Sequence, residues 1–180
     1  MPVEFAVFDT AIGTCGLAWR DTTIIGTALP GSSPASTRSW LSRRHPAATD
    51  VTGTEPPPEI RTAIDKITDL LAGGRPDLSD LPLDLESQPE FNRRAYEIAR
   101  QIPPGKTMTY GDIAHALGMP GAAQAVGQAM GNNPFPIIVP CHRVLAAGSK
   151  HGGFSAPGGV ETKRRMLVIE GALPDEPTLF

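Results

Sequence analysis

The chain contains 180 residues, of which 40% are hydrophobic and 19% charged, and its formal net charge at pH 7 is −3. This length suits one or two small domains with a real core, and no apolar run is long enough to cross a membrane. The N-terminus lacks the basic region and long apolar core of a signal peptide, and two distant cysteines are a poor disulfide framework. We therefore expect a protein of the reducing cytoplasm with no membrane partner.

The first part of the chain predicts an antiparallel meander. Three segments have the alternation and composition of strands: 3–8, 15–19 and 22–28, with a turn at 9–13 between the first two. Residues 33–44 then predict a helix that begins at a Ser33 cap, with Trp40 and Leu41 facing inward. The proline-rich segment 45–58 predicts a loop.

A second helix is expected over residues 60–71, where apolar side chains recur at helical spacing and Gly73 follows as a stop signal. Segment 75–90 is rich in Pro, Asp and Leu and contains one candidate edge strand at 81–85. We interpret this segment as the connection between two parts.

From residue 90 the pattern changes to short helices. Apolar spacing predicts three of them: 91–102, 110–117 with Thr109 as its cap, and 120–130. The last two, joined by a Gly-Met-Pro turn, have the shape of a helix-turn-helix. A final amphipathic helix over 160–171 is expected to turn Val160, Met166, Leu167 and Ile169 inward and Lys163, Arg164 and Arg165 mostly outward.

Charge is distributed unevenly along the chain. Residues 91–171 contain nine Lys/Arg and four Asp/Glu, a net +5, whereas the remainder contains seven and fifteen, a net −8. Such asymmetry indicates one face that meets a polyanion, although a chance partition would give the same count.

Residues 131–145 place a lone cysteine in an unusual setting. Three prolines interrupt the apolar run before Cys141 and leave at most a very short strand at 137–139, so the chain must turn at the cysteine. A helix beginning after Pro140 would favour the thiolate through its N-terminal N–H groups, and Arg143 would add to that field. On chemistry alone, the alternative is a buried cysteine that merely fills space.

The run 133–144, Asn-Pro-x-Pro-x-x-x-Pro-Cys-His-Arg-Val, closely resembles the active-site signature of the O6-alkylguanine-DNA alkyltransferases. The resemblance covers residues 90–171 closely and the first 85 residues only in size and strand order. It implies an α/β (α+β) fold in which residues 1–85 form an RNase H-like antiparallel sheet with helices. Residues 90–175 would form a helical, DNA-binding and catalytic domain with the helix-turn-helix. No cofactor and no metal are implied.

Members of this family transfer an alkyl group irreversibly from damaged guanine to their own cysteine, which matches Cys141. The resemblance implies that His142 reaches this thiol through a water, that Glu170 orients His142, and that Asn133 braces the turn before the cysteine. Without the resemblance, Glu170 would be taken for a surface carboxylate at a helix end. Adjacency alone would not select His142 as the base.

The resemblance also implies a set of residues that bind DNA or the target base: Tyr110, Gln124, Arg143, Val144, Phe154 and Ser155. Tyr110 would help to rotate the nucleotide out of the duplex, with core packing as the alternative. Flipping is required because a cysteine cannot approach the O6 alkyl carbon in line within the stack. The partner is then double-stranded DNA with O6-alkylguanine, and O4-alkylthymine as a second lesion, bound by a monomer. Phosphate contacts would make this binding weaken with salt.

Three departures from the family pattern stand out. Gln124 occupies the position of the arginine that normally fills the hole left by the flipped base, and glutamine is shorter and uncharged. Segment 155–159, Ser-Ala-Pro-Gly-Gly, lengthens the pocket loop by two residues relative to the usual Ser-Gly-Gly. The zinc ligands of some relatives are not evident, because Cys15 and His45 are the only nearby candidates.

Several other functions are alternatives to alkyl transfer. The Gln124 departure favours a lesion-binding, alkyltransferase-like protein without efficient transfer, although such proteins lack the reactive cysteine. A hydrolase with a Cys–His pair and a helix-turn-helix regulator both leave the run at 133–144 unexplained. A metal site of Cys141, His142 and His151 would lack a fourth ligand at zinc spacing.

Overall fold

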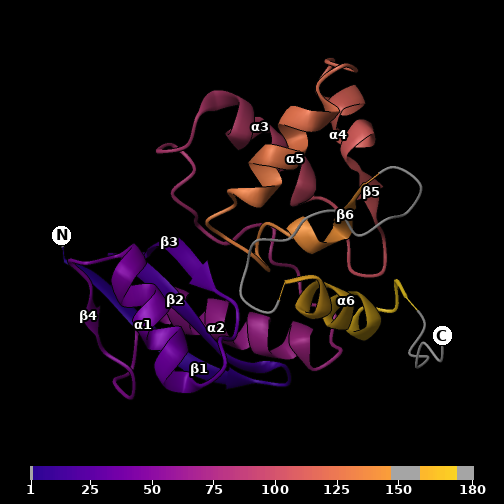
Figure 1. Ribbon diagram of the computed structural model, residues 1–180. Coiled ribbons are helices and arrows are strands. Elements are labelled where there is room, and N and C mark those ends of the chain that lie inside the picture. The colour runs from indigo at the N-terminus through magenta and orange to yellow at the C-terminus, as the bar shows by residue number, and fades with distance from the viewer. Residues whose placement is uncertain (1, 147–158, 174–180) are drawn as a thin grey trace.

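The computed structural model describes residues 2–146 and 159–173 and is shown in Figure 1. The first part of the chain forms a four-stranded sheet in the order β3-β2-β1-β4. Strands β1 (Val3–Thr10), β2 (Gly13–Arg20) and β3 (Thr23–Ala28) form the predicted antiparallel meander. The turn between β1 and β2 is shorter than expected, since the strands pair as far as Thr10 and Gly13.

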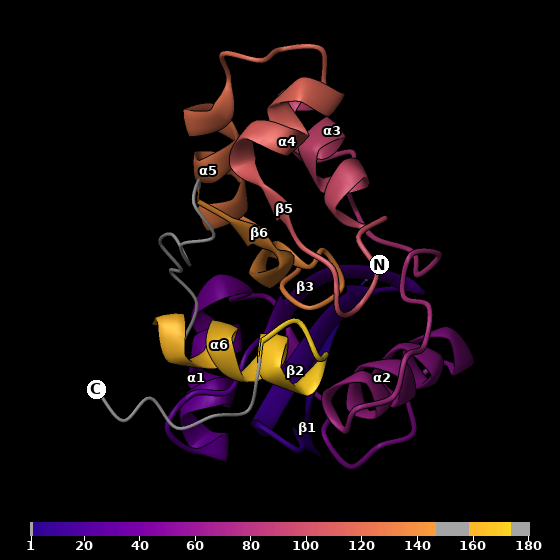
Figure 2. The same cartoon turned by 90° about the vertical axis from the view of Figure 1, so that its right-hand side faces the viewer.

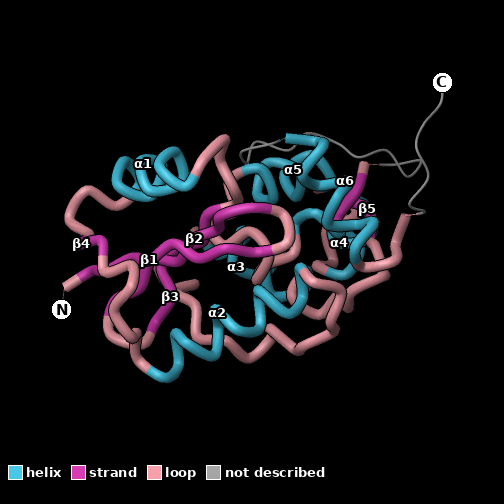
Figure 3. The backbone as a smooth tube through the Cα atoms, turned by 90° about the horizontal axis from the view of Figure 1, so that it is seen from below, coloured by secondary structure: helices cyan, strands magenta, loops and turns pink. Residues whose placement is uncertain are grey.

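Two helices cover opposite faces of this sheet, as Figure 3 shows. Helix α1 (Pro34–Arg44) begins at the predicted Ser33 cap, and its buried Leu41 packs with Phe5 and Val7 on one face. Trp40 is only partly buried there. Helix α2 (Pro58–Leu71) buries the predicted apolar stripe on the other face, against the alternate residues of the strands.

Two predictions in the loops were wrong. The segment expected to be a loop at 45–58 contains β4 (Thr49–Asp50), which pairs in parallel with β1. Segment 81–85 forms no strand and makes only a single bridge between Leu83 and Ile24. Ile24 N–H donates to the carbonyl of Pro82, and the Ile24 carbonyl accepts from Asp84 N–H.

The second part contains the expected run of short helices. Helix α3 (Glu90–Ala99) ends three residues earlier than predicted. Helix α4 (Tyr110–Ala116) agrees with the prediction, and Thr109 and Asp112 form a capping box at its start. Helix α5 (Ala123–Gly131) begins three residues later than predicted, because the N–H of Ala122 closes a turn onto Met119. The hydroxyl of the buried Tyr96 donates to the carbonyl of Ala129 (2.7 Å) and ties α3 to α5.

The remaining elements carry the unusual cysteine. Strand β5 (Met108–Thr109) pairs in parallel with β6 (Val144–Leu145), and the 3₁₀ helix η1 (Cys141–Arg143) immediately precedes β6. Helix α6 (Gly159–Ile169) lies beside the sheet in Figures 1 and 2, below α3 to α5. Val160 is 45% exposed, so its predicted inward position was wrong.

The larger hydrophobic core runs through both parts of the chain: it includes Leu17 and Trp19 of the sheet together with Ile113 and Val126 of α4 and α5. The division into domains at 1–85 and 90–175 stays a prediction. Within the described residues, no helix has the length and apolar character needed to span a bilayer.

Candidate active site

The loop before Cys141 is a series of turns. The prolines were expected to leave at most a very short strand at 137–139, and no strand forms there: Val139 N–H donates back to the carbonyl of Phe135 (2.8 Å). Asn133 braces this loop: its Nδ2 donates to the Val139 carbonyl and its Oδ1 accepts from Phe135 N–H, both at 2.9 Å. Ile137 has a φ of 79°, an unfavourable value for a β-branched residue. Strain at this position is typical of a functional loop.

The edge strand of the sheet holds the same loop. Thr27 of β3 donates its N–H to the carbonyl of Pro134 (3.0 Å) and its hydroxyl to the carbonyl of Pro136 (2.7 Å). The second of these bonds is buried. Because prolines lack an N–H and cannot form a full ladder, two carbonyls are the contacts they offer to an edge strand. The N-terminal sheet therefore positions the loop that leads to Cys141.

Cys141 opens η1 and is only 6% exposed. Burial raises the pKa of its thiol; Asn133, the Lys163 ammonium and the backbone N–H groups of residues 141 and 142 act in the opposite direction. The expected turn at the N-terminus of a helix is thus present, but its field does not outweigh burial. In the resting protein the sulfur carries its proton.

Lys163 was missed by the sequence interpretation. Its predicted outward position was wrong: the residue is 1% exposed and its Nζ donates to the carbonyl of Val144 (3.0 Å), next to the cysteine. Lys163, Met166, Leu167 and Glu170 are all buried and recur at the i, i+3, i+4, i+7 spacing of one helix face. That periodicity was the sequence signal that could have placed Lys163 on the buried face of α6.

His142 and Glu170 meet inside the protein. His142 Nε2 lies 2.9 Å from Glu170 Oε2, and both side chains are almost fully buried. Burial alone would raise the pKa of Glu170, but His142 and Arg143 lower it to about 2, so the carboxylate is ionised. An ionised carboxylate can only accept a hydrogen bond, so Nε2 carries the proton and donates it to Glu170, which leaves Nδ1 as the basic nitrogen of a neutral ring.

The protonation state of His142 fits a base. Burial lowers its pKa, against the opposing effect of Glu170, so the ring is neutral at rest. Its Nδ1 is buried and has no hydrogen-bond partner among the described residues. A neutral imidazole with one free, buried lone pair is equipped to take a proton from a nearby thiol.

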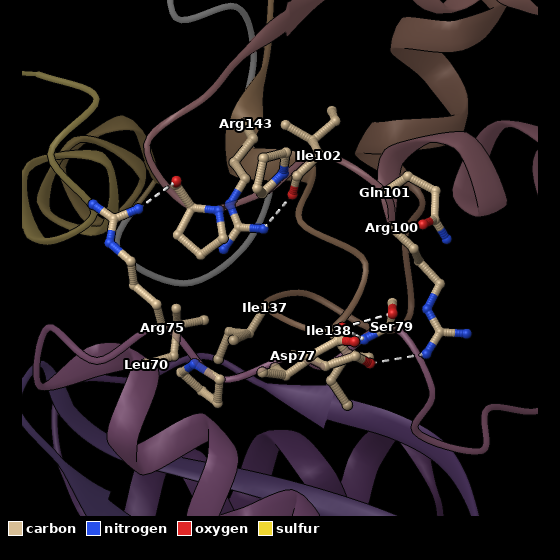
Figure 4. Close-up of a pocket in the computed structure, with 14 residues that line it drawn as sticks. Leu70, Arg75, Asp77, Ser79, Arg100, Gln101, Ile102, Ile137, Ile138 and Arg143 are labelled. Atoms are coloured by element: carbon tan, nitrogen blue, oxygen red, sulfur yellow. Dashed lines mark hydrogen bonds between the residues drawn. The ribbon is translucent and has the colours of Figure 1, made fainter.

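Arg143 supports Glu170. Its Nε and Nη2 donate to the two carboxylate oxygens of Glu170 at 2.8 and 2.7 Å, and its Nη1 donates to the carbonyl of Ile102 (2.7 Å). Figure 4 shows the guanidinium turned toward Ile102. The structure therefore places Arg143 in a buried, bidentate ion pair with Glu170, and its predicted contact with DNA stays a prediction.

The remaining predicted residues lie around this centre. Tyr110 is half-buried at the start of α4; burial raises its pKa and the neighbouring Cys141 adds to the rise, and its ring lies over Gly127 of α5. Val144 is buried in β6. Gln124 is exposed near the start of α5, apart from the buried cluster. Phe154 and Ser155 lie outside the described residues.

Part of the positive charge of the second part is engaged by contacts within the protein. Several of its cations donate to backbone carbonyls: Arg94 to Leu117, Arg100 to Leu78 and Leu81, Arg143 to Ile102, Lys163 to Val144, and Arg165 to Ala11. Residues 107–142, which include α4 and α5, contain no lysine or arginine. The net +5 of this half therefore does not describe a charged face on the helix-turn-helix.

A metal site is not built from the described residues, which contain no group of three or more His, Cys, Asp or Glu side chains that could hold an ion. His151, the third residue of the zinc alternative, lies outside them. Both cysteines are free, and burial raises the pKa of Cys15 to about 12. Cys15 is thus a thiol without nucleophilic character.

Comparisons with known proteins agree on one family. A family model described as 6-O-methylguanine DNA methyltransferase, DNA binding domain, matches residues 90–172. A methylated-DNA–protein-cysteine methyltransferase of Mycobacterium tuberculosis (strain ATCC 25618 / H37Rv) is 41% identical over 179 residues, 99% of each chain. One of Mycolicibacterium paratuberculosis is 35% identical over 180 residues, again 99% of each.

Solved structures give the same result. The crystal structure of Mycobacterium tuberculosis OGT in complex with DNA is similar with a TM-score of 0.75 and 34% identity, over 94% of this chain and 93% of that one. The O6-methylguanine-DNA methyltransferase of Pyrococcus kodakaraensis has a TM-score of 0.69 and 26% identity, over 93% and 99% of the two chains. The similarity thus extends over both parts of the chain.

Proposed function

Because the chain belongs to the methylated-DNA–protein-cysteine methyltransferase family, we propose that it repairs double-stranded DNA carrying O6-alkylguanine by moving the alkyl group to Cys141. The observation that carries this assignment is the buried Cys141 followed directly by a neutral His142 that is held by an ionised Glu170. We assign O4-alkylthymine as a second lesion. We also assign a monomer as the active form, since one chain supplies both the helix-turn-helix and the thiol. Its compartment is the reducing cytoplasm, in keeping with two free cysteines.

The reaction follows from the protonation states. As the sulfur attacks the alkyl carbon, its proton passes to His142 Nδ1 through a water, and the resulting imidazolium is stabilised by Glu170. The S–C bond forms as the C–O6 bond breaks. The electron pair of that bond goes to guanine, which takes up a proton and leaves. The products are an S-alkylcysteine and unmodified guanine, so the protein reacts only once.

Asn133 and Lys163 prepare the sulfur for this step. Both favour the thiolate against the effect of burial, the amide through a hydrogen bond and the ammonium through its charge. A thiol that is protonated at rest and ionised only when a substrate is in place is protected from unrelated electrophiles. We assign Tyr110, beside the cysteine at the start of α4, as the residue that turns the target nucleotide out of the stack.

Intact-protein mass spectrometry tests the function. After incubation with a duplex carrying one O6-methylguanine, the wild type is expected to gain one methylene, and a Cys141→Ser variant is expected to gain nothing. Because serine is nearly isosteric with cysteine, this variant is expected to keep the fold and controls for adducts elsewhere. An unchanged wild-type mass with the DNA still bound would instead favour the lesion-binding, alkyltransferase-like function.

Gln124 is expected to limit the reaction on duplex DNA. In a Gln124→Arg variant, a longer and charged side chain would fill the vacated stack better and contact phosphate. We expect faster transfer from duplex DNA, little change with free O6-alkylguanine, and a slope of log affinity against log salt that is steeper by about 0.9. Ser42→Arg on the exposed side of α1 is the control for added charge. Equal effects on both substrates would contradict a role at the duplex.

A further inference from the structure

Arg75 links the connection after α2 to the end of α6. Its Nη1 donates to the carbonyl of Pro104 (2.6 Å) and its Nη2 donates to the backbone carbonyl of Glu170 (3.0 Å). Figure 4 shows the side chain of Arg75 extending away from Leu70 and ending in a dashed hydrogen bond to a carbonyl oxygen. Arg75 lies outside the segment 90–172 that matches the family's DNA-binding domain.

The Glu170 carbonyl is one that its own helix leaves unpaired. Helix α6 ends in a turn where Ala172 N–H donates to Leu167 and Gly171 N–H to Val168, with Gly171 at a φ of 82°. The last carbonyls of a helix have no N–H ahead of them and carry its negative dipole end. A guanidinium is a suitable partner for such an end, and here it comes from a distant part of the chain.

Arg75 is exposed as a whole, but the loop at 103–105 approaches its guanidinium closely on one side. A Cβ at Gly105 would lie 3.1 Å from the Glu170 carbonyl oxygen and 3.2 Å from Arg75 Nη1. Gly105 has a φ of 90°, so the loop at 103–105 takes a backbone conformation that brings it against Arg75 without a side chain. One planar guanidinium thus donates to the backbone of two segments at once. A lysine ammonium lacks this fixed, forked arrangement of donors.

We propose that Arg75 is a positioning residue for Glu170. By fixing the end of α6 against the loop at 103–105, it keeps the carboxylate in place for its contact of 2.9 Å with His142 Nε2. The inference rests on the proposed function, because it assigns Glu170 to the support of the base. It gives the segment between the two parts of the chain a direct role in the rate of transfer.

The test compares Arg75→Met with Arg100→Met. Arg100 also joins the two parts, through the carbonyls of Leu78 and Leu81, but it has no contact with Glu170 among the described residues. Single-turnover rate constants are measured by mass spectrometry with a methylated duplex and with free O6-benzylguanine, well below each variant's melting temperature. Affinity for an unmodified duplex is measured in parallel.

For Arg75→Met we expect transfer to slow about tenfold with both substrates, because the support of a reactive group is lost, while the affinity for DNA changes less than about twofold. Arg75→Lys is expected to recover only part of the rate. Arg100→Met is expected to lower the melting temperature without slowing transfer. Wild-type rates in Arg75→Met, or equal losses in both variants, would overturn the positioning role. A wild-type protein that forms no adduct would instead refute the proposed function.

Discussion

A Glu170→Gln variant is expected to lose about 3 kcal/mol of unfolding free energy and to transfer the alkyl group at least about tenfold more slowly. The isosteric amide keeps the shape of the site but leaves the buried guanidinium of Arg143 without a counter-charge. It also removes the anion that stabilises a protonated His142. Thermal unfolding is expected to occur about 6–12 °C lower for a protein of this size.

The pH dependence of the unfolding free energy checks that the charge of Glu170 is the cause of this stabilisation. Because the pKa of Glu170 is lowered from its ordinary 4.5 to about 2 in the folded protein, its stabilisation is present above pH 4.5. It is lost as the pH falls from 4.5 through 2. The wild type should therefore lose stability across this window more steeply than Glu170→Gln. The matched control is Glu161→Gln, an exposed position in the first turn of the same helix. Parallel curves for wild type and Glu170→Gln would refute the assignment.

The parts of the fold predicted best are those with a strong apolar period. Helix α2 and the β1–β2–β3 meander follow directly from periods of 3.6 and 2. Strand β4 was missed because it is two residues long and both are exposed, so it has no apolar pattern. The start of α5 was misplaced because Pro120 is a usual first residue of a helix, whereas here it belongs to a turn.

The site was predicted from the resemblance more than from physical reasoning. The sequence shows that Cys141 is in a special loop, but it does not show that residues 142 and 170, which are 28 positions apart, meet in the core. Arg143 and Lys163 were both expected to face outward or toward a ligand, because charged side chains are seldom buried. Each can be buried because a backbone carbonyl, and for Arg143 also a carboxylate, accepts its hydrogen bonds. Pairing of this kind depends on tertiary contacts that a local pattern does not contain.

Because Lys163 is buried close to Cys141, its replacement is expected to change the acidity of the Cys141 thiol strongly. Burial raises the pKa of Cys141, and the Lys163 ammonium acts against that rise; burial likewise lowers the pKa of Lys163, against the opposing effect of the sulfur. In a Lys163→Met variant the methionine fills the space of the aliphatic stem but brings no charge. The pKa of Cys141 is therefore expected to rise further. Transfer at neutral pH should slow about tenfold for each unit of that rise.

A pH–rate profile of transfer from free O6-benzylguanine separates this effect from damage to the fold. Lys163→Met should shift the midpoint of the profile to higher pH and approach the wild-type rate in alkali. Loss of the bond to the Val144 carbonyl should cost about 1–3 kcal/mol of stability, which leaves a folded protein to assay at low temperature. The exposed Lys106→Met is the control for the loss of one positive charge. A Lys163→Met profile that is lower at every pH with an unchanged midpoint would show that the ammonium shapes the site without setting the ionisation of Cys141.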